Sequence, residues 1–267
     1  MLPRDPTARP SPAWRGAALC AALLAVAGAG LYARSPGASA ASLVALPAPA
    51  GATLPNAATQ AAGLQTVVLS GGCFWGVQGV FEHVRGVTRA VSGYTGGEAA
   101  TARYELVSTG ATGHAESVEV TFDPGQVSYA QVLRIFFSVA LDPTEVDRQG
   151  PDSGTQYRSE VFVRDAAQAG AARAYIAQLD AAQAFARPIA TRVDRLDRFY
   201  PAEAHHQDFL VRHPDFPYIA AFDMPKVAAL QRLFPAQYVE TPVTVQPDAV
   251  QPGTVRHVIL QPVRDPA

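Results

Sequence analysis

Between residues 66 and 86, the order of apolar and polar positions predicts a strand followed directly by a helix. Residues 66–70 form a short apolar run suited to a buried strand, and two glycines end it. Apolar side chains then recur every three or four residues, which predicts a helix that ends near Gly86. The members of this helical face are Val77, Val80, Phe81 and Val84. Cys73 therefore lies at a junction between strand and helix.

Further along the chain, predicted strands and helices alternate. Residues 116–122 alternate between apolar and polar side chains, as a strand with one buried face does. Ser128 and Gln131 can form a capping box ahead of one helix, and Asp165 can cap a longer one. The other predicted strands are 87–94, 157–163 and 189–196, and the predicted loops are 93–104 and 142–156. Short loops and a hairpin-like turn argue against a strictly parallel sheet, so we expect an α+β fold with helices packed on a mixed sheet in a two-layer sandwich.

Composition divides the chain into four regions. Residues 1–40 begin with Arg4, Arg9 and Arg15, continue with an apolar run and end in small residues, which is the order of an export signal, although the run just suffices for a membrane anchor. Residues 41–63 are rich in Ala and Pro and are expected to be a linker. We expect the folded domain at 64–234 and an extended or disordered tail at 235–267. The N-terminal region predicts a periplasmic or extracytoplasmic location, with the signal either cleaved or retained as an anchor.

Charge and cysteine content exclude several classes of function. The formal net charge is -2, and no cluster of Lys and Arg with interleaved aromatic residues is present, which argues against a nucleic-acid partner. The two cysteines, Cys20 and Cys73, are too few for a disulfide framework and lack the spacing of a structural zinc site. We therefore expect no metal and no cofactor, and a monomeric chain.

The junction at Cys73 has the features of a reactive thiol. Gly71 and Gly72 permit a tight turn that delivers the cysteine to a helix N-terminus. Unpaired N–H groups and the positive end of the helix dipole favour a thiolate there. An isolated cysteine is more often an inert, buried residue, so the position alone leaves both interpretations open.

Neighbouring residues can supply the rest of a site. Phe74 and Trp75 can form an apolar wall for a methyl-bearing substrate, or they can be ordinary core residues. Glu116 shares the phase of the buried residues of its strand, so its carboxyl group is expected to face the core, where desolvation would keep it protonated as a general acid needs. If the strand begins later, Glu116 is instead an exposed loop residue.

Asp152 and Tyr157 frame a glycine-containing turn at the entrance of a predicted strand, a common position for site residues. The phenols of Tyr104 and Tyr157 can donate hydrogen bonds to a polar oxygen. Tyrosines half-buried in a sheet without such a role are the more frequent case.

Four motifs in sequence give the chain a specific resemblance. They are Gly71-Gly72-Cys73-Phe74-Trp75-Gly76, Gly93-Tyr94-Thr95-Gly96-Gly97, Gly113-His114-Ala115-Glu116 and Gly154-Thr155-Gln156-Tyr157-Arg158-Ser159. In this order they resemble the motifs of the peptide methionine sulfoxide reductase A family, and residues 199–207 are similar to its C-terminal motif. The resemblance covers about residues 66–220.

The resemblance implies a role for each candidate residue. It implies that Cys73 is the nucleophile, Glu116 the acid, and Asp152 a residue that supports the site. It implies that Tyr104 and Tyr157 bind the sulfoxide oxygen. The aromatic pair Phe74 and Trp75 would hold the S-methyl group. The implied activity is reduction of the S epimer of methionine sulfoxide, free or in oxidised proteins, in an α+β fold.

The chain departs from the family pattern in its cysteines. Many members have further cysteines near the C-terminus that form a disulfide with the nucleophile, but no cysteine follows Cys73 here, and position 108 is Ser. We therefore expect a small thiol or a thioredoxin-like protein to reduce a Cys73 sulfenic acid directly. Leu141 and Ser153 stand where His is expected in many relatives.

Two other function classes remain open from the residues. A thiol that forms a sulfenic acid can serve as a peroxidase, which turnover of peroxide would reveal. A tethered module that binds oxidised methionine without turning it over is the other alternative, and its binding would survive the Cys73→Ser change.

Overall fold

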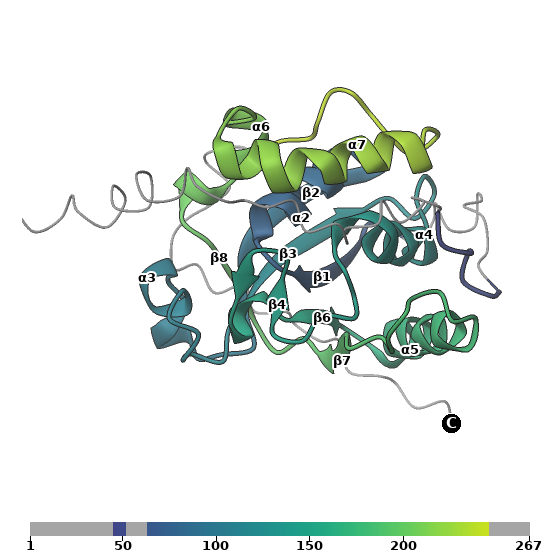
Figure 1. Ribbon diagram of the computed structural model, residues 1–267, viewed down its shortest axis with the longest axis horizontal. Coiled ribbons are helices and arrows are strands. Elements are labelled where there is room, and N and C mark those ends of the chain that lie inside the picture. Colours follow the sequence, from purple (N-terminus) through teal and green to yellow (C-terminus); the bar gives the residue numbers. More distant parts are fainter. Residues whose placement is uncertain (1–44, 52–62, 246–267) are drawn as a thin grey trace, which may run out of the picture. The chain divides into compact units, whose positions relative to one another are not determined.

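The computed structural model describes residues 45–51 and 63–245, which form a mixed sheet with helices packed on it (Figure 1). Six strands lie in the order β7-β6-β1-β3-β2-β8, and only the β6–β7 pair is parallel. The strands are β1 (Gln65–Gly71), β2 (Val87–Thr95), β3 (Ala115–Phe122), β6 (Ser159–Val163), β7 (Arg192–Arg195) and β8 (Phe199–Pro201). A small separate hairpin joins β4 (Arg148–Gln149) to β5 (Asp152–Ser153).

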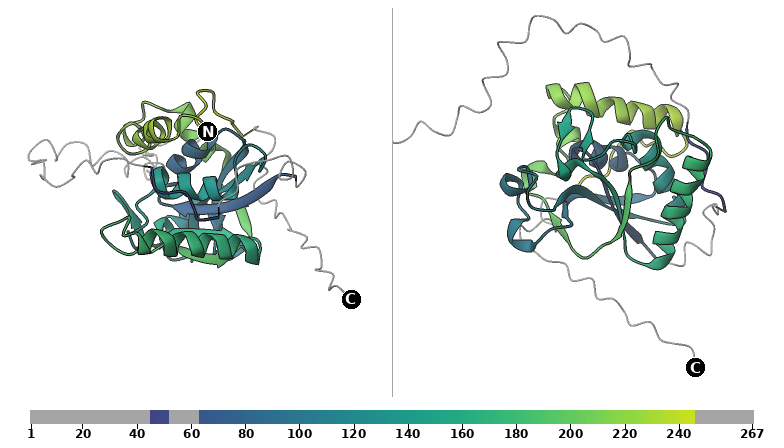
Figure 2. Two further views of the ribbon diagram at one scale, coloured as in Figure 1. Left: turned by 90° about the vertical axis from the view of Figure 1, so that its right-hand side faces the viewer. Right: turned by 60° about the horizontal axis from the view of Figure 1, so that its bottom comes forward.

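The helices differ widely in length. The α-helices are α2 (Phe74–Glu82), α3 (Tyr104–Val107), α4 (Tyr129–Ile135), α5 (Ala166–Ala181), α6 (Phe209–Arg212) and α7 (Met224–Leu233). Single 3-10 turns are η1 (Ala99–Thr101), η3 (Thr155–Tyr157) and η4 (Ala204–His206), and wider π turns are η2 (Phe136–Ala140) and η5 (Ile219–Asp223). Helix α2 contacts the central strands and α7, whereas α5 packs on β6 and β7 (Figures 1 and 2).

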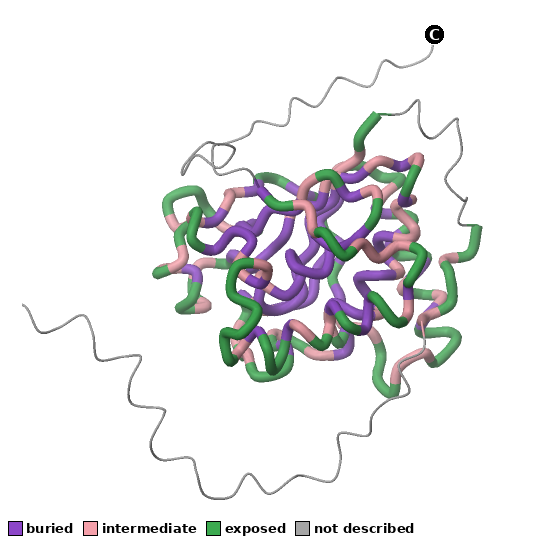
Figure 3. Tube along the Cα trace, turned by 90° about the horizontal axis from the view of Figure 1, so that it is seen from above, coloured by how far each residue is buried: buried purple, intermediate pink, exposed green. Residues whose placement is uncertain are grey.

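One face of the sheet carries the main hydrophobic core. Along β1, Val67 and Leu69 join this core while Val68 points to the opposite face, as the period of a strand requires. Helices α2, α4, α5 and α7 all contribute side chains to the same cluster, and the cluster on the opposite face contains no helical residue. The buried segments gather at the centre of the domain (Figure 3). The predicted α+β fold with helices layered on a mixed sheet is therefore confirmed.

Most predicted elements form close to their predicted bounds. The strand and helix around Cys73 are β1 and α2, and the predicted capping box of Ser128 and Gln131 is present at the start of α4. The predicted loop at 93–104 was wrong at both ends, since residues 93–95 complete β2 and Tyr104 begins α3. Tyr157 lies in a turn before β6 rather than in the strand.

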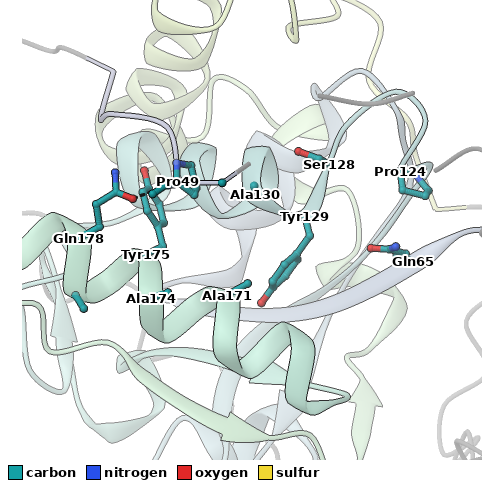
Figure 4. A pocket seen from close by; sticks show the side chains of 13 residues that line it. Pro49, Gln65, Pro124, Ser128, Tyr129, Ala130, Ala171, Ala174, Tyr175 and Gln178 are labelled. Atoms are coloured by element: carbon teal, nitrogen blue, oxygen red, sulfur yellow. Dashed lines mark hydrogen bonds between the residues drawn. The ribbon is translucent and has the colours of Figure 1, made fainter. Parts of the chain in front are cut away.

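Residues 45–51, within the predicted linker, lie against helices α4 and α5. The Tyr175 hydroxyl donates a hydrogen bond to the Pro47 carbonyl at 2.8 Å, and Gln178 bonds both Ala48 and Ala50. Arg134 donates to the Leu46 carbonyl at 2.6 Å. The segment borders a pocket of about 570 Å³ whose other walls include Tyr129 and Tyr175 (Figure 4). Composition alone did not predict this docking.

The first part of the predicted tail also contacts the domain. Backbone amides of Val239 and Val243 donate hydrogen bonds to the carbonyls of His83 and Glu82, at the C-terminal end of α2. Tyr238 forms a single bridge with Val84, and Val245 is buried. The rest of the predicted tail, 246–267, the predicted export signal and most of the predicted linker lie outside the described residues, so the division into four regions stays a prediction.

Candidate active site

Cys73 is the N-cap residue of α2, directly after the turn that leaves β1. Gly72 has φ +87°, and a Cβ atom there would lie 2.5 Å from the Cβ of Gln149, so both the conformation and the space require glycine. The cysteine side chain is almost enclosed, with 9% of the residue exposed. The predicted delivery of the thiol to a helix N-terminus is thus what the structure shows.

Glu116 faces the same helix N-terminus from β3. Its Oε2 atom accepts a hydrogen bond from the Phe74 backbone N–H at 3.0 Å, one residue after the cysteine. Only 2% of Glu116 is exposed, and this burial raises the pKa of its carboxyl group to about 8, with the charges of Asp152 and Asp223 adding to the effect. The alternating pattern therefore predicted its inward position correctly. A carboxyl group with this pKa is protonated at neutral pH and can give up a proton.

The ionisation of Cys73 differs from the sequence prediction. Burial raises the pKa of the thiol well above its usual value, and the charges of Glu116 and Asp223 raise it further. The Trp75 backbone amide and the Lys226 ammonium act in the opposite direction but are weaker. The helix N-terminus was expected to favour a thiolate, but desolvation outweighs the helix amides and keeps the pKa of Cys73 raised.

Tyr104 and Tyr157 lie beside this pair, both half-buried. Burial is the main cause that raises the pKa of each phenol, and the charges of Glu116, Asp152 and Cys73 raise it further. Both phenols therefore stay protonated and able to donate. They approach the sulfur from different elements, α3 and η3. Neither hydroxyl has a hydrogen-bond partner among the described residues, which leaves both free to meet a substrate oxygen.

Glu203 fixes the position of Tyr104. One carboxylate oxygen accepts the Tyr104 backbone N–H at 3.0 Å, and the other accepts the Tyr94 hydroxyl at 2.8 Å. These hydrogen bonds lower the pKa of Glu203 against the opposing effect of burial, so the carboxylate stays charged. Glu203 lies within the C-terminal motif at residues 199–207, but no sequence pattern assigns it this role.

The aromatic residues after Cys73 divide between core and surface. Phe74 is buried, whereas Trp75 is partly exposed and stacks on Phe209 with ring centroids 3.9 Å apart. The Trp75 indole N–H donates to His206 at 3.3 Å, and His206 packs 5.2 Å from Phe74 and 4.5 Å from Tyr104, between ring centroids. Phe74, Trp75 and His206 thus form one aromatic cluster, and Phe74 also belongs to the main hydrophobic core, so the role of Phe74 and Trp75 in holding a methyl group stays a prediction.

A cavity of about 340 Å³ opens beside Cys73. Asp152 and Tyr218 line it, and the Tyr218 hydroxyl donates a short hydrogen bond to Asp152. Burial raises the pKa of Asp152, while this bond and the charge of Lys226 oppose the rise. The side chain of Asp152 thus borders the site, as predicted. The other predicted site residues do not line this cavity; they are Phe74, Trp75, Tyr104, Glu116 and Tyr157.

Three residues near the site were not predicted from the sequence: Tyr218, Asp223 and Lys226. Tyr218 directly precedes η5 and Lys226 lies on α7, and both line the cavity, whereas Asp223 ends η5 and pairs with Lys226. The signal was present, since Val227 and Leu230 repeat at helical spacing after Met224-Pro225. The described residues contain no group of three or more His, Cys, Asp or Glu side chains that could hold a metal ion.

Comparison with known proteins decides the family. The model of the family described as peptide methionine sulfoxide reductase matches residues 65–237. The chain belongs to this family. A peptide methionine sulfoxide reductase MsrA 2 from Mesorhizobium japonicum is 57% identical over 185 residues, which cover 69% of this chain and 95% of the relative. An MsrA 2 from Synechocystis is 52% identical over 180 residues, 67% of this chain and 82% of the relative.

A solved family structure has the same fold. Reduced Mxr1 from Saccharomyces cerevisiae gives a TM-score of 0.53 at 28% identity, over 58% of this chain and 88% of the yeast chain. The resemblance based on four motifs is therefore confirmed, and the chain is an oxidoreductase of the methionine sulfoxide reductase type. The matched range includes every predicted site residue, from Cys73 to Tyr157.

Proposed function

We propose that this chain reduces the S epimer of methionine sulfoxide, free or in oxidised proteins, with Cys73 as the nucleophile and Glu116 as the general acid. The observation that carries the proposal is the pairing of these two groups. A protonated, buried carboxyl group is hydrogen-bonded to the amide of the residue that follows the thiol. Family membership supports the reaction, and the pairing supports the assignment of roles.

The reaction follows from the electronic demand of a sulfoxide. Its sulfur is attacked by a thiolate only when its oxygen is protonated or strongly hydrogen-bonded. The Cys73 sulfur attacks the sulfoxide sulfur, while Glu116 gives its proton to the oxygen and Tyr104 and Tyr157 donate hydrogen bonds to it. This attack forms an S–S bond between Cys73 and the substrate. The hydroxyl group then passes from the substrate sulfur to the Cys73 sulfur while the S–O and S–S bonds to the substrate sulfur break, so methionine leaves and Cys73 carries the oxygen as a sulfenic acid.

An external thiol completes the cycle in this proposal. The chain has no cysteine after Cys73, and Cys73 is the free cysteine of the described residues. One thiol of a small reductant or of a thioredoxin-like protein displaces water from the sulfenic acid and forms a mixed disulfide. A second thiol then releases Cys73.

A comparison of three variants tests the proposal. The parent chain, Cys73→Ser and Glu116→Gln are incubated with a peptide that contains the S-sulfoxide and with dithiothreitol, and reduced peptide is measured. We expect turnover by the parent, none by Cys73→Ser, and a strong loss in Glu116→Gln. Equal rates in all three would overturn the proposal. The R-sulfoxide peptide and hydrogen peroxide serve as control substrates, and faster turnover of peroxide would favour a peroxidase instead.

We further propose that the chain works as a monomer in the periplasm or another extracytoplasmic compartment. The support is the N-terminal order of arginines, apolar run and small residues. No helix in the described residues is long and apolar enough to span a membrane. Cell fractionation with sequencing of the mature N-terminus tests the location, and a cytoplasmic, uncleaved chain would contradict it.

A further inference from the structure

Lys226 is the only lysine in the 267 residues, and every other basic side chain except the histidines is an arginine. It lies on α7 and lines the same cavity as Cys73. Lysine carries its charge on a compact ammonium at the end of a flexible stem, whereas the guanidinium of arginine is a broad plane. The one lysine of the chain thus lies at the cavity that contains the Cys73 thiol.

Asp223 holds this lysine in place. The Lys226 Nζ donates to Asp223 Oδ1 at 3.0 Å, and the aspartate side chain is fully buried while 22% of the lysine side chain is exposed. The other carboxylate oxygen, Oδ2, has no hydrogen-bond partner. Among the described residues, Lys226 is thus the hydrogen-bond partner of the Asp223 carboxyl group, whose pKa is raised by burial and lowered by the lysine.

The ion pair is packed against the first turn of α2. A Cβ atom at Gly76 would lie 2.1 Å from Asp223 Oδ1 and 2.9 Å from Lys226 Nζ. Any larger residue at Gly76 would displace the pair. Because Gly76 has no side chain, Asp223 and Lys226 can pack against the helix turn that follows Cys73.

Two acidic groups that face Cys73, Glu116 and Asp223, oppose its ionisation. Glu116 from β3 and Asp223 from η5 are acidic, and Asp152 from β5 lines the same cavity. Three phenols, those of Tyr104, Tyr157 and Tyr218, also interact with the sulfur. Against them stand the Trp75 amide and the charge of Lys226, both of which lower the pKa of the thiol.

We propose that Lys226 is a positioning residue whose ammonium, held by Asp223, is the counter-charge that lets the buried Cys73 sulfur become an anion. The proposal rests on the proposed role of Cys73 as the nucleophile. Lys226 forms no bond to the substrate and transfers no proton in this role. It acts by keeping one positive charge at a fixed place beside a site dominated by carboxyl groups and phenols.

Titration of the thiol tests the proposal without any turnover. In full-length Cys20→Ser protein, where Cys73 is the only thiol, the rate of alkylation by iodoacetamide is measured from pH 6 to 11. We expect Lys226→Met to move the midpoint of the pH profile upward by about half a unit or more, which is at least about threefold slower alkylation at a fixed pH below the midpoint. Lys226→Arg, which keeps the positive charge, should bring the midpoint most of the way back to that of the parent.

Matched controls separate charge from structure. Arg232→Met removes one positive charge from an exposed position of the same helix and should leave the midpoint unchanged. A change in access to the thiol alters the plateau rate but not the midpoint. Circular dichroism and thermal unfolding verify each fold, and Lys226→Gln replaces Lys226→Met if the latter does not fold.

An unchanged midpoint in a folded Lys226→Met or Lys226→Gln protein would overturn the proposal, and so would a Lys226→Arg profile that matches the Met variant. In turnover of the sulfoxide peptide, the same loss should appear in kcat/KM below the midpoint and disappear above it. If the midpoint shifts as expected but the parent chain reduces no sulfoxide, the counter-charge stands and the proposed function fails.

Discussion

The two ends of α2 each have a buried glutamate, and the two residues differ in what surrounds them. At the N-terminal end, Glu116 accepts the Phe74 amide and lies beside the thiol. At the C-terminal end, Glu82 is completely buried, and neither of its carboxyl oxygens has a hydrogen-bond partner. Burial raises the pKa of both groups, and that of Glu82 is raised further by the close approach of the Asp208 carboxyl group and then by its charge.

The helix explains the difference. Free amide N–H groups at the N-terminus offer donors to Glu116, whereas the C-terminus offers only carbonyl oxygens, which a carboxylate cannot use. Glu116 can therefore alternate between its two protonation states, because each state has a stabilising neighbour. Glu82 is stable only when it is protonated. In the proposed function, the same residue type is thus a proton donor at one end of the helix and a buried structural acid at the other.

The largest expected effect separates the two glutamates by activity. Glu116→Gln removes the transferable proton but retains an acceptor for the Phe74 amide, so kcat/KM for the sulfoxide peptide should fall by about 10² to 10⁴. Glu82→Gln should leave kcat/KM within about twofold, because Glu82 has no contact with the site. Steady-state kinetics measures both, and similar losses in the two variants would erase the distinction.

The pH profile of the parent enzyme is the next test. Catalysis needs the thiolate together with protonated Glu116, and the pKa of Glu116 is about 8 while that of Cys73 is raised above its ordinary value. Below both pKa values the thiolate fraction limits the rate, so kcat/KM should rise about tenfold per pH unit and level off near pH 8. Above that pH, loss of protonated Glu116 balances the gain in thiolate. A plateau at low pH followed by a fall near 8 would show a preformed thiolate and contradict the burial argument.

The free energy of unfolding should depend on the protonation state of Glu82. Its pKa in the folded state is raised above the value of about 4.3 in the unfolded chain, so the folded state binds the extra proton and stability falls as pH rises above that value. Glu82→Gln removes this dependence, and its amide can donate to Asp208. The free energy of unfolding of the variant relative to the parent should therefore increase by about 1 kcal/mol or more between pH 5 and 8. Urea unfolding at both pH values measures it, and parallel profiles would show that Glu82 ionises freely.

A smaller effect is expected from Asp208→Asn. The Oδ1 atom of Asp208 accepts the Val245 N–H at 2.9 Å, and an Asn side chain keeps that acceptor while it removes the charge beside Glu82. Asn also tolerates the left-handed conformation of this residue, with φ +53°. We expect a gain of about 0.5 kcal/mol at pH 8 and almost none at pH 5. A loss at both pH values would mean that the carboxylate itself is needed to hold Val245.

Local pattern was enough to predict one side of the site. Alternation in β3 placed Glu116 towards the core, and the apolar face of α2 with the glycines before it placed Cys73 at the helix N-terminus. Both predictions depend on near neighbours in the sequence. Tyr104 and Tyr157 were identified only through the family resemblance, because no periodic pattern shows where a loop tyrosine points.

The parts that were missed depend on distant segments. Glu203 reaches Tyr104 across 99 positions, and Lys226 reaches the cavity from the last helix. The raised pKa of Cys73 was not predicted, because a helix N-terminus, which favours a thiolate, is visible in a sequence, whereas the degree of burial depends on every segment that covers the thiol. Such effects follow from the assembled fold.

The oxidation state of Cys73 after a single turnover without reductant is the strongest test of the proposed mechanism. Equal amounts of full-length Cys20→Ser protein and S-sulfoxide peptide are mixed, and intact-mass and peptide-mapping spectrometry follow both partners. The account predicts one reduced peptide per chain and one added oxygen on Cys73, which a sulfenic-acid reagent traps. Reduced peptide with no oxygen on Cys73, or an unmodified chain that leaves the sulfoxide intact, would contradict it.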